Sequence, residues 1–269
     1  MLNKRVLNNE YGLAEMQENL LLTLDVLDAV CRKNKIHYAI HGGTMLGAER
    51  NHHLIPWDDD VDVSMKRSEF EKLKKVIQAD QIPSNFYLDE YTMWFPRFVM
   101  IRQEHPVYID ILIWDYISEK PIAQWMKITL LRAIQGMMKE DVDYSKYGLK
   151  GKILLGVTQG IGKLISNEAK LSIFHTIQTK GFLGKKKYIH RSNDSYRGCT
   201  YILDNKYMDG YTKIELEGRY YMVNKRYHEF LVMEYGENYL TPPPMKDRHP
   251  GHVQFRKSIE KKQKAGLQK

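Results

Sequence analysis

The chain has few cysteines and lacks a long uncharged apolar run. Its two cysteines, Cys31 and Cys199, are far apart among 269 residues and form no close pair of the zinc or redox type. We therefore expect reduced thiols and a cytoplasmic protein. No segment approaches the about 20 apolar residues needed to cross a bilayer. Residues 1–12 also lack the apolar core of a signal peptide.

Acidic residues are outnumbered, with 33 Asp and Glu against 41 Lys and Arg, which gives a formal net charge of +8. Such an excess favours an anionic partner, such as a nucleotide, a nucleic acid, a phosphorylated polymer or an anionic membrane surface. The simpler alternative is a solvated basic tail, because residues 257–269 carry five lysines and one glutamate. The net charge alone does not separate these two interpretations.

Apolar periodicity predicts an α+β protein without internal repeats. Helices are expected over residues 14–34, 44–50 and 67–79, the last with Ser68 as its N-cap. Strands are expected over residues 36–43, 60–65, 86–93, 96–102 and 107–114, and the nearly continuous apolar character of the last is typical of a buried central strand. Residues 188–255 are rich in tyrosine and combine short β-like pieces with one helix and a proline stop at 241–244.

Residues 121–138 and 149–165 are predicted to form basic amphipathic helices. Helices of this kind most often pack on a protein core. The alternative is an interfacial surface that contacts anionic lipid, which would give the protein a peripheral position on the inner face of the membrane.

Four aspartates in five positions are the most informative feature of the chain: Asp58, Asp59, Asp60 and Asp62. Their mutual repulsion favours a bound cation, although an exposed acidic turn is the alternative. On a strand, Asp60 and Asp62 would point to the same side, roughly 6.5–7 Å apart. Two carboxylates at that spacing suit Mg²⁺, which completes its coordination with water and substrate phosphate.

Other residues strengthen this prediction of a metal and phosphate site. Gly42 and Gly43 would let the backbone approach a phosphate, and Thr44 would add a hydroxyl at the start of a helix. Asp110 lies within an apolar strand, where a carboxylate is costly unless it is paired or bound to metal. Cations that could hold phosphate charge flank these elements at Arg50, Lys66, Arg97 and Arg102.

Three segments together resemble the LicD family of phosphotransferases, which includes the fukutin-related proteins and lies in the nucleotidyltransferase superfamily. They are HGGTMLGAERNHHLIPWDDDVDVSM (41–65), YIDILIWD (108–115) and FLVMEYGENYLTPPPMKDRHPGH (230–252). Residues 121–200 carry no motif of that family. The resemblance implies a nucleotidyltransferase-like mixed sheet flanked by helices, with an inserted helical segment and a C-terminal α/β extension. The expected single domain covers residues 1–256, with a core at about 14–118, a helical insert at about 121–180, a C-terminal part at about 185–256 and a frayed tail at 257–269.

The resemblance also implies a reaction and assigns roles. Phosphocholine, or a similar phospho-alcohol, would pass from CDP-choline or another CDP-alcohol to a hydroxyl of a cell-surface glycan, teichoic acid or lipid-linked glycopolymer precursor. Mg²⁺, with Mn²⁺ as an alternative, would bind Asp60 and Asp62, with Asp58 in a supporting role. Asp110 would be a third ligand or the general base.

Four further residues have two interpretations each. Trp57 would stack on a base or a quaternary ammonium, or would only pack under the Pro56 turn. Lys246, Arg248 and His249 would assist at the donor phosphate, or would lock the C-terminal segment onto the core.

Two other functions remain open. The first is transfer of a nucleoside monophosphate from a nucleoside triphosphate, as in the wider superfamily. The second is non-enzymatic nucleic-acid binding. We do not expect it, because the aromatic residues are not interleaved with Lys and Arg and the acidic cluster would repel a phosphate backbone.

Overall fold

The computed structural model describes residues 7–102, 106–139, 142, 144–180, 187–194 and 197–251. They form two compact units. The first contains the described parts of Met1–Thr92, Pro96–Ile111 and Met208–Lys269, and the second those of Met93–Phe95 and Leu112–Tyr207. The α+β class is confirmed. The predicted domain boundaries stay a prediction, and the tail at 257–269 lies outside the described residues.

The first unit contains a sheet built around one apolar strand. Its strands are neighbours in the order β1 (Ala39–His41), β2 (Asp62–Lys66), β5 (Val107–Ile117), β4 (Arg97–Met100) and β3 (Phe86–Asp89). The pairs β1–β2, β3–β4 and β4–β5 are antiparallel. Ile109 and Ile111 of β5 are fully buried, as the apolar run predicts for a central strand.

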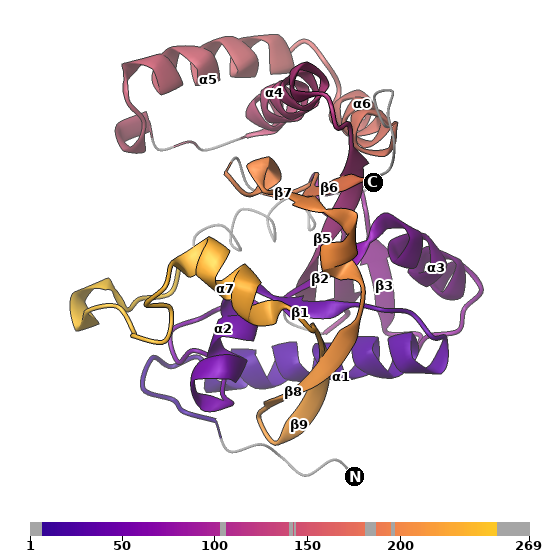
Figure 1. Cartoon of the computed structure of the whole chain (residues 1–269), viewed down its shortest axis with the longest axis vertical. Coiled ribbons are helices and arrows are strands. Elements are labelled where there is room, and N and C mark those ends of the chain that lie inside the picture. The colour runs from indigo at the N-terminus through magenta and orange to yellow at the C-terminus, as the bar shows by residue number, and fades with distance from the viewer. Residues whose placement is uncertain are drawn as a thin grey trace. The chain divides into compact units, whose positions relative to one another are not determined.

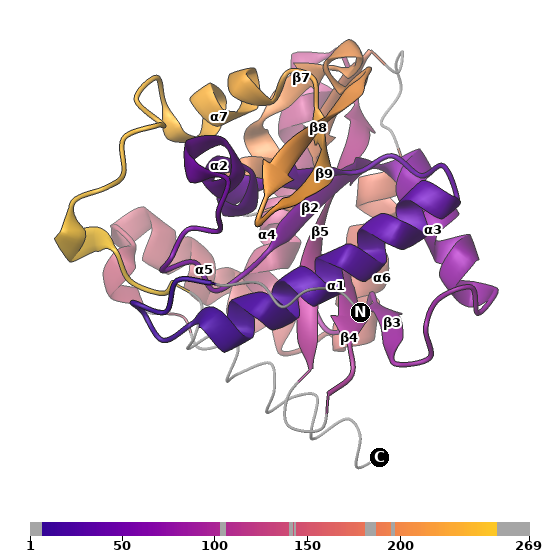
Figure 2. The ribbon, with the colours of Figure 1, turned by 90° about the horizontal axis from the view of Figure 1, so that it is seen from below.

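Helix α1 (Ala14–Lys33) covers this sheet and contacts β4 (Figure 2). The leucines that define its apolar stripe are fully buried or nearly so: Leu20, Leu21, Leu24 and Leu27. Helix α3 (Arg67–Gln78) begins at the predicted residue and ends one residue earlier than predicted. Lys66 occupies its N-cap without a side-chain hydrogen bond, so the prediction of Ser68 as the cap is wrong.

The C-terminal part of the chain completes the first unit. Strands β8 (Tyr211–Leu216) and β9 (Arg219–Asn224) form an antiparallel hairpin, and α7 (Tyr227–Tyr235) follows it. Helix α2 (Gly42–Asn51) contacts β1, β8 and α7 (Figure 1). Segments nearly 200 residues apart are therefore neighbours, and a hydrogen bond of 2.6 Å from the Tyr221 hydroxyl to Asp25 Oδ1 is one of their links.

The second unit contains helices α4 (Pro121–Met138), α5 (Leu149–Gly162) and α6 (Asn167–Thr179). Strand β6 (Tyr188–Arg191) pairs with the end of β5 and with β7 (Ile202–Asp204). Helix α4 has the predicted bounds, α5 ends three residues early, and α6 was not predicted as an element. Across the two units, single 3-10 turns lie at Tyr144–Lys146, Gly198–Thr200, Asn205–Met208 and Met245–Asp247, the last in the first unit.

Polar groups in the core of the second unit are held by specific bonds. The Lys127 Nζ atom is buried and donates to the carbonyls of Tyr116 and Gln178, both at 2.8 Å. His190 is fully buried, with its Nδ1 atom 3.0 Å from the Cys199 carbonyl. Burial, and then the charge of Lys127, lower the pKa of His190 to about 4. The fold therefore requires a neutral imidazole.

This requirement predicts loss of stability in mild acid. Between pH 6.5 and about 4 the unfolded chain binds a proton that folded His190 does not. The free energy of unfolding should therefore fall as pH falls, by up to about 1.4 kcal/mol per pH unit. Urea denaturation across this range should show a shallower pH dependence for His190→Gln. The exposed-site variant His249→Gln should keep the wild-type slope, and equal slopes in all three proteins would contradict the prediction.

Candidate active site

The predicted phosphate-binding segment connects a strand directly to a helix. His41 is the last residue of β1, and Gly42 is the first residue of α2. Gly42 has φ +55°, a conformation that residues with a Cβ atom rarely adopt. The chain therefore turns from strand to helix within one residue, and the first N–H groups of α2 lie beside the acidic segment.

Two aspartates lie against these glycines. A Cβ atom at Gly43 would be 2.2 Å from Asp58 Oδ2, and one at Gly42 would be 3.0 Å from Asp62 Oδ2. The N-terminal end of a helix favours negative charge, because its N–H groups have no partner within the helix. In the structure, the glycines therefore make room for carboxylates. Phosphate binding by Gly42, Gly43 and Thr44 stays a prediction.

Hydrogen bonds fix the acidic segment in this position. The Asp62 N–H donates to Thr44 Oγ1 at 3.1 Å, and His41 is the antiparallel partner of Asp62 in the β1–β2 register. The side chain of Gln17, on α1, donates to the carbonyls of Ile55 and Asp58 at 3.0 and 2.9 Å. Contacts from a helix, a strand and a second helix thus hold a segment that has no regular structure of its own.

Strand β2 begins at Asp62, two residues later than predicted. Asp60 therefore precedes the strand, and the expected i, i+2 pair on one strand face is wrong. Asp58, Asp60 and Asp62 are partly exposed, whereas Asp59 is fully buried. This burial suits Asp59 to a structural contact, and it leaves the other three carboxylates accessible.

Tyr235, at the end of α7, lies within the electrostatic range of these carboxylates, and sequence reasoning did not single it out. Burial, and then nearby negative charges, raise the pKa of its phenol well above the usual value. The charges are, in order of effect, those of Glu234, Asp62, Asp58 and Asp60. The adjacent Glu234 is 3.1 Å from His41 Nε2. The sequence feature that could have indicated Tyr235 is its position in the C-terminal segment 230–252, which resembles the LicD-family pattern.

Asp110 lies beside the acidic segment, and its carboxylate is paired with the guanidinium of Arg97. Its N–H donates to the Val61 carbonyl at 3.3 Å, so β5 runs next to the residues that precede β2. Its Oδ1 atom accepts a hydrogen bond of 2.8 Å from Nε of Arg97, which is 1% exposed. The requirement for a partner in this apolar strand is thus met by Arg97. A metal ion at Asp110 would share this carboxylate with Arg97.

The C-terminal segment supplies two arginine contacts near this site. Arg50 donates to the carbonyls of Tyr239 and Thr241 at 2.7 and 3.2 Å. Arg248 donates to the Pro243 carbonyl at 2.9 Å, and its guanidinium lies 5.1 Å from the Trp57 ring centre. The Arg50 bonds and the Arg248–Trp57 contact hold the C-terminal segment against the core, whereas the Arg248–Pro243 bond lies within that segment.

Charge also links the arginines to the site. Burial lowers the pKa of Arg50, the phenol of Tyr235 raises it, and the guanidinium of Arg248 lowers it. Arg50 therefore lies within electrostatic range of both groups. Two guanidinium groups within electrostatic range of each other favour binding of a nearby anion.

Four predicted residues are not gathered here: Lys66, Arg102, Lys246 and His249. Arg102 donates to the Asn19 side chain of α1, and Lys66 forms an ion pair of 3.1 Å with Asp209. Lys246 and His249 are exposed. Trp57 packs beside Tyr11, with 5.7 Å between ring centres.

The donor set fits Mg²⁺ only in part. Within the described ranges, no three His, Cys, Asp or Glu side chains are arranged as a group that could hold a metal ion. The three accessible carboxylates are hard oxygen donors, and Mg²⁺ commonly binds one or two carboxylates together with waters and substrate phosphates. The residues present are therefore compatible with an ion that binds together with a phosphate substrate.

Residues 35–144 match the family model described as LicD/FKTN/FKRP, nucleotidyltransferase domain. The chain carries a LicD-family domain. The matched range contains the α2 glycines, the acidic segment and Asp110. A curated relative, the lipopolysaccharide cholinephosphotransferase LicD of Haemophilus influenzae, is 27% identical over 272 aligned positions, which cover 89% of this chain and 96% of that protein. The resemblance predicted from the three segments is thus confirmed.

The contact between Gly43 and Asp58 predicts a specific coupling in the LicD-family domain. Alanine normally stabilises a helix relative to glycine by about 1 kcal/mol. At position 43 its Cβ would displace the Asp58 carboxylate, so Gly43→Ala should lower the free energy of unfolding by roughly 1–3 kcal/mol. In an Asp58→Ala background the same change should be neutral or stabilising. Urea denaturation of the four proteins in this cycle tests it, and additive effects would contradict the proposed contact.

Proposed function

We propose that this protein is a Mg²⁺-dependent transferase that moves phosphocholine, or a similar phospho-alcohol, from a CDP-activated donor to a hydroxyl of a cell-surface glycan, teichoic acid or lipid-linked glycopolymer precursor. The observation that carries the proposal is the convergence of the Asp58 and Asp62 carboxylates on the start of α2. The cholinephosphotransferase name of the Haemophilus relative supports the class of reaction.

The proposed reaction is a direct displacement at phosphorus. The acceptor hydroxyl oxygen bonds to the phosphorus that bears the alcohol, the bond from that phosphorus to the bridging oxygen breaks, and CMP leaves. The hydroxyl proton passes to a base. The chemistry that bound Mg²⁺ supplies is neutralisation of charge on the diphosphate. Asp60 and Asp62 would hold the ion, with Asp58 in support.

Asp110 has one of two roles in this proposal. While it is paired with Arg97, the Asp110 carboxylate would act either as a further metal ligand or as the acceptor of the hydroxyl proton. Arg97 itself is then a positioning residue, because it sets the orientation of that carboxylate and is buried beneath it.

Arg50 and Arg248 are suited to the donor phosphates. Their mutual repulsion would be relieved by an anion, and both are anchored through backbone carbonyls of the C-terminal segment. Trp57, which stacks with Arg248, would contact the base or the quaternary ammonium of the donor.

Substitution of the acidic residues tests the metal site. Asp60→Asn and Asp62→Asn should each lower kcat by about 10²–10³-fold, because each removes charge from the site where the diphosphate is neutralised. CMP release is measured with CDP-choline, CDP-glycerol and CDP-ribitol in the presence of an acceptor glycan. EDTA should abolish release, and added Mg²⁺ should restore it.

The control for this test is Asp80→Asn, an exposed position with φ +51°, a conformation that asparagine accepts. It should leave turnover unchanged. Unchanged turnover in the Asp60 and Asp62 variants would disprove the metal assignment. Release of pyrophosphate from CTP, without release of CMP from any CDP-alcohol, would instead establish nucleotidyl transfer. Metal-independent, salt-sensitive binding of a nucleic-acid duplex without turnover would establish the nucleic-acid function.

A second substitution tests the donor site. Arg248→Ala should raise KM for the CDP-alcohol by about tenfold, since it removes one charge-assisted contact to phosphate. KM for the acceptor should not change. The matched control is Arg226→Ala, at an exposed arginine of the same unit. If Arg248 only locks the C-terminal segment, Arg248→Ala will lower the melting temperature and leave KM as it was.

A further inference from the structure

Helix α5 has an apolar face that is open to solvent. We define the open face as Leu149, Ile153, Val157 and Ile161 of α5, together with Leu164, which follows the helix by two residues. The four helical residues are spaced by four, so they lie on one side of α5 and span an arc of about 120°. Leu149 at the start of α5 and Leu164 just beyond its end are 76% and 87% exposed. The exposure therefore runs along the whole helix.

The opposite face of α5 is already used for packing. Leu155, Thr158 and Gly162 are buried. A Cβ atom at Gly162 would be 2.4 Å from the Met137 carbonyl oxygen, and one at Gly136 of α4 would be 2.6 Å from Thr158 Oγ1. These close approaches fix the side of α5 that faces α4. The open face is therefore a second apolar surface of the helix.

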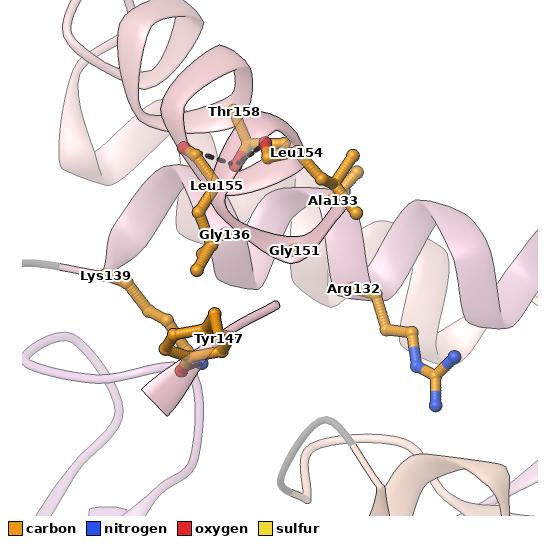
Figure 3. Close-up of a pocket in the computed structure, with 9 residues that line it drawn as sticks. All are labelled: Arg132, Ala133, Gly136, Lys139, Tyr147, Gly151, Leu154, Leu155 and Thr158. Atoms are coloured by element: carbon orange, nitrogen blue, oxygen red, sulfur yellow. Dashed lines mark hydrogen bonds between the residues drawn. The ribbon is translucent and has the colours of Figure 1, made fainter. Parts of the chain in front are cut away.

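A shallow pocket borders this surface (Figure 3). It lies between α4 and α5, has a volume of about 80 Å³, and its lining includes Ala133, Gly136, Gly151 and Leu154. Thr158 bonds to carbonyls of its own helix, and Lys139 Nζ is 3.2 Å from the Tyr147 hydroxyl. Leu154, which is 50% exposed, joins the pocket to the surface of α5. The lining contains no carboxylate.

Helices α4 and α5 contain no Asp or Glu. Lys150 and Lys152 of α5 and Lys163, its C-cap residue, are exposed. Near the start of α4, Ile122, Trp125 and Met126 are exposed as well, at 76%, 67% and 43%. An apolar helix face with flanking lysines is typical of a helix that lies in the interface of an anionic membrane.

We propose that the open face of α5 binds the surface of an anionic lipid bilayer, with the helix axis in the membrane plane. No helix in the described part of the chain is long and apolar enough to span a bilayer. The 14 residues of α5 form a helix about 21 Å long, which suits contact along one leaflet. The lysines would contact lipid phosphates and the open face would enter the acyl boundary. The proposal does not depend on the proposed reaction.

The structure also decides which cations can take part. Lys127 lies in the predicted basic amphipathic helix over residues 121–138, but it is fully buried and donates to two carbonyls. A buried ammonium cannot contact lipid, so Lys127 is not one of these cations. Lys150, Lys152 and Lys163 are the cations to test.

The experiment is sedimentation of the full-length protein with vesicles, either of phosphatidylcholine alone or of equal parts phosphatidylcholine and phosphatidylglycerol. The wild type should bind the mixed vesicles, and high salt should weaken that binding. The triple change Lys150→Glu, Lys152→Glu, Lys163→Glu should lower the partition coefficient at least about tenfold. The double change Ile153→Ser, Val157→Ser should lower it by a similar factor, about tenfold.

Matched controls separate this face from general surface properties. Ile101→Ser changes an isoleucine of the first unit that is 54% exposed, and Lys213→Glu reverses an exposed lysine of β8. Neither should alter partitioning. Circular dichroism and thermal unfolding confirm that each variant is folded, and a misfolded variant is replaced by the single changes Leu164→Ser or Lys152→Glu.

Three results would overturn the proposal. The first is a wild type that binds neither vesicle. The second is binding that the α5 variants do not reduce. The third is a wild-type dimer in sedimentation velocity that the α5 variants dissociate, with no vesicle binding, which would assign the open face to a second copy of the chain.

Discussion

The contact between two carboxylates and the first turn of α2 is the constraint on which the candidate site depends. The Asp58 and Asp62 carboxylate oxygens lie only 2.2 and 3.0 Å from where Cβ atoms of Gly43 and Gly42 would be. The pairing of His41 with Asp62 brings the strand and the helix start together, and the Thr44 hydroxyl accepts the Asp62 N–H. One arrangement thus uses the absence of side chains at two glycines, the register of two strands and the preference of a helix N-terminus for negative charge.

A cluster of acids in a folded protein requires compensation, and this chain provides it from distant segments. Asp110 is paired with buried Arg97, and Glu234 of α7 lies beside His41. Arg50 and Arg248 are anchored by carbonyls of the segment that follows α7. The C-terminal part of the chain is therefore a component of the site, which explains why its motif accompanies the acidic motif in the LicD-like pattern.

The second unit shows that amphipathic sequence does not by itself identify a surface. Helices α4 and α5 both combine apolar residues with lysine, yet Lys127 of α4 is buried and bonded to two carbonyls, while the lysines of α5 are exposed. Whether a lysine is buried or exposed depends on which neighbouring helix packs against its face. Helix α4 packs against both α5 and α6, whereas α5 packs on α4 and leaves its other apolar face open.

The sequence alone determined the α+β class, the bounds of α4, the central position of β5 and the family, because these follow from local periodicity and from contiguous motifs. It also indicated a metal site from the acidic cluster. Only the tertiary structure decided that β2 begins at Asp62, that Arg97 binds Asp110, and that Tyr235 lies near the carboxylates. These facts depend on contacts between residues far apart in the chain. Side-chain type and spacing do not fix such contacts, because register and packing between distant elements decide them.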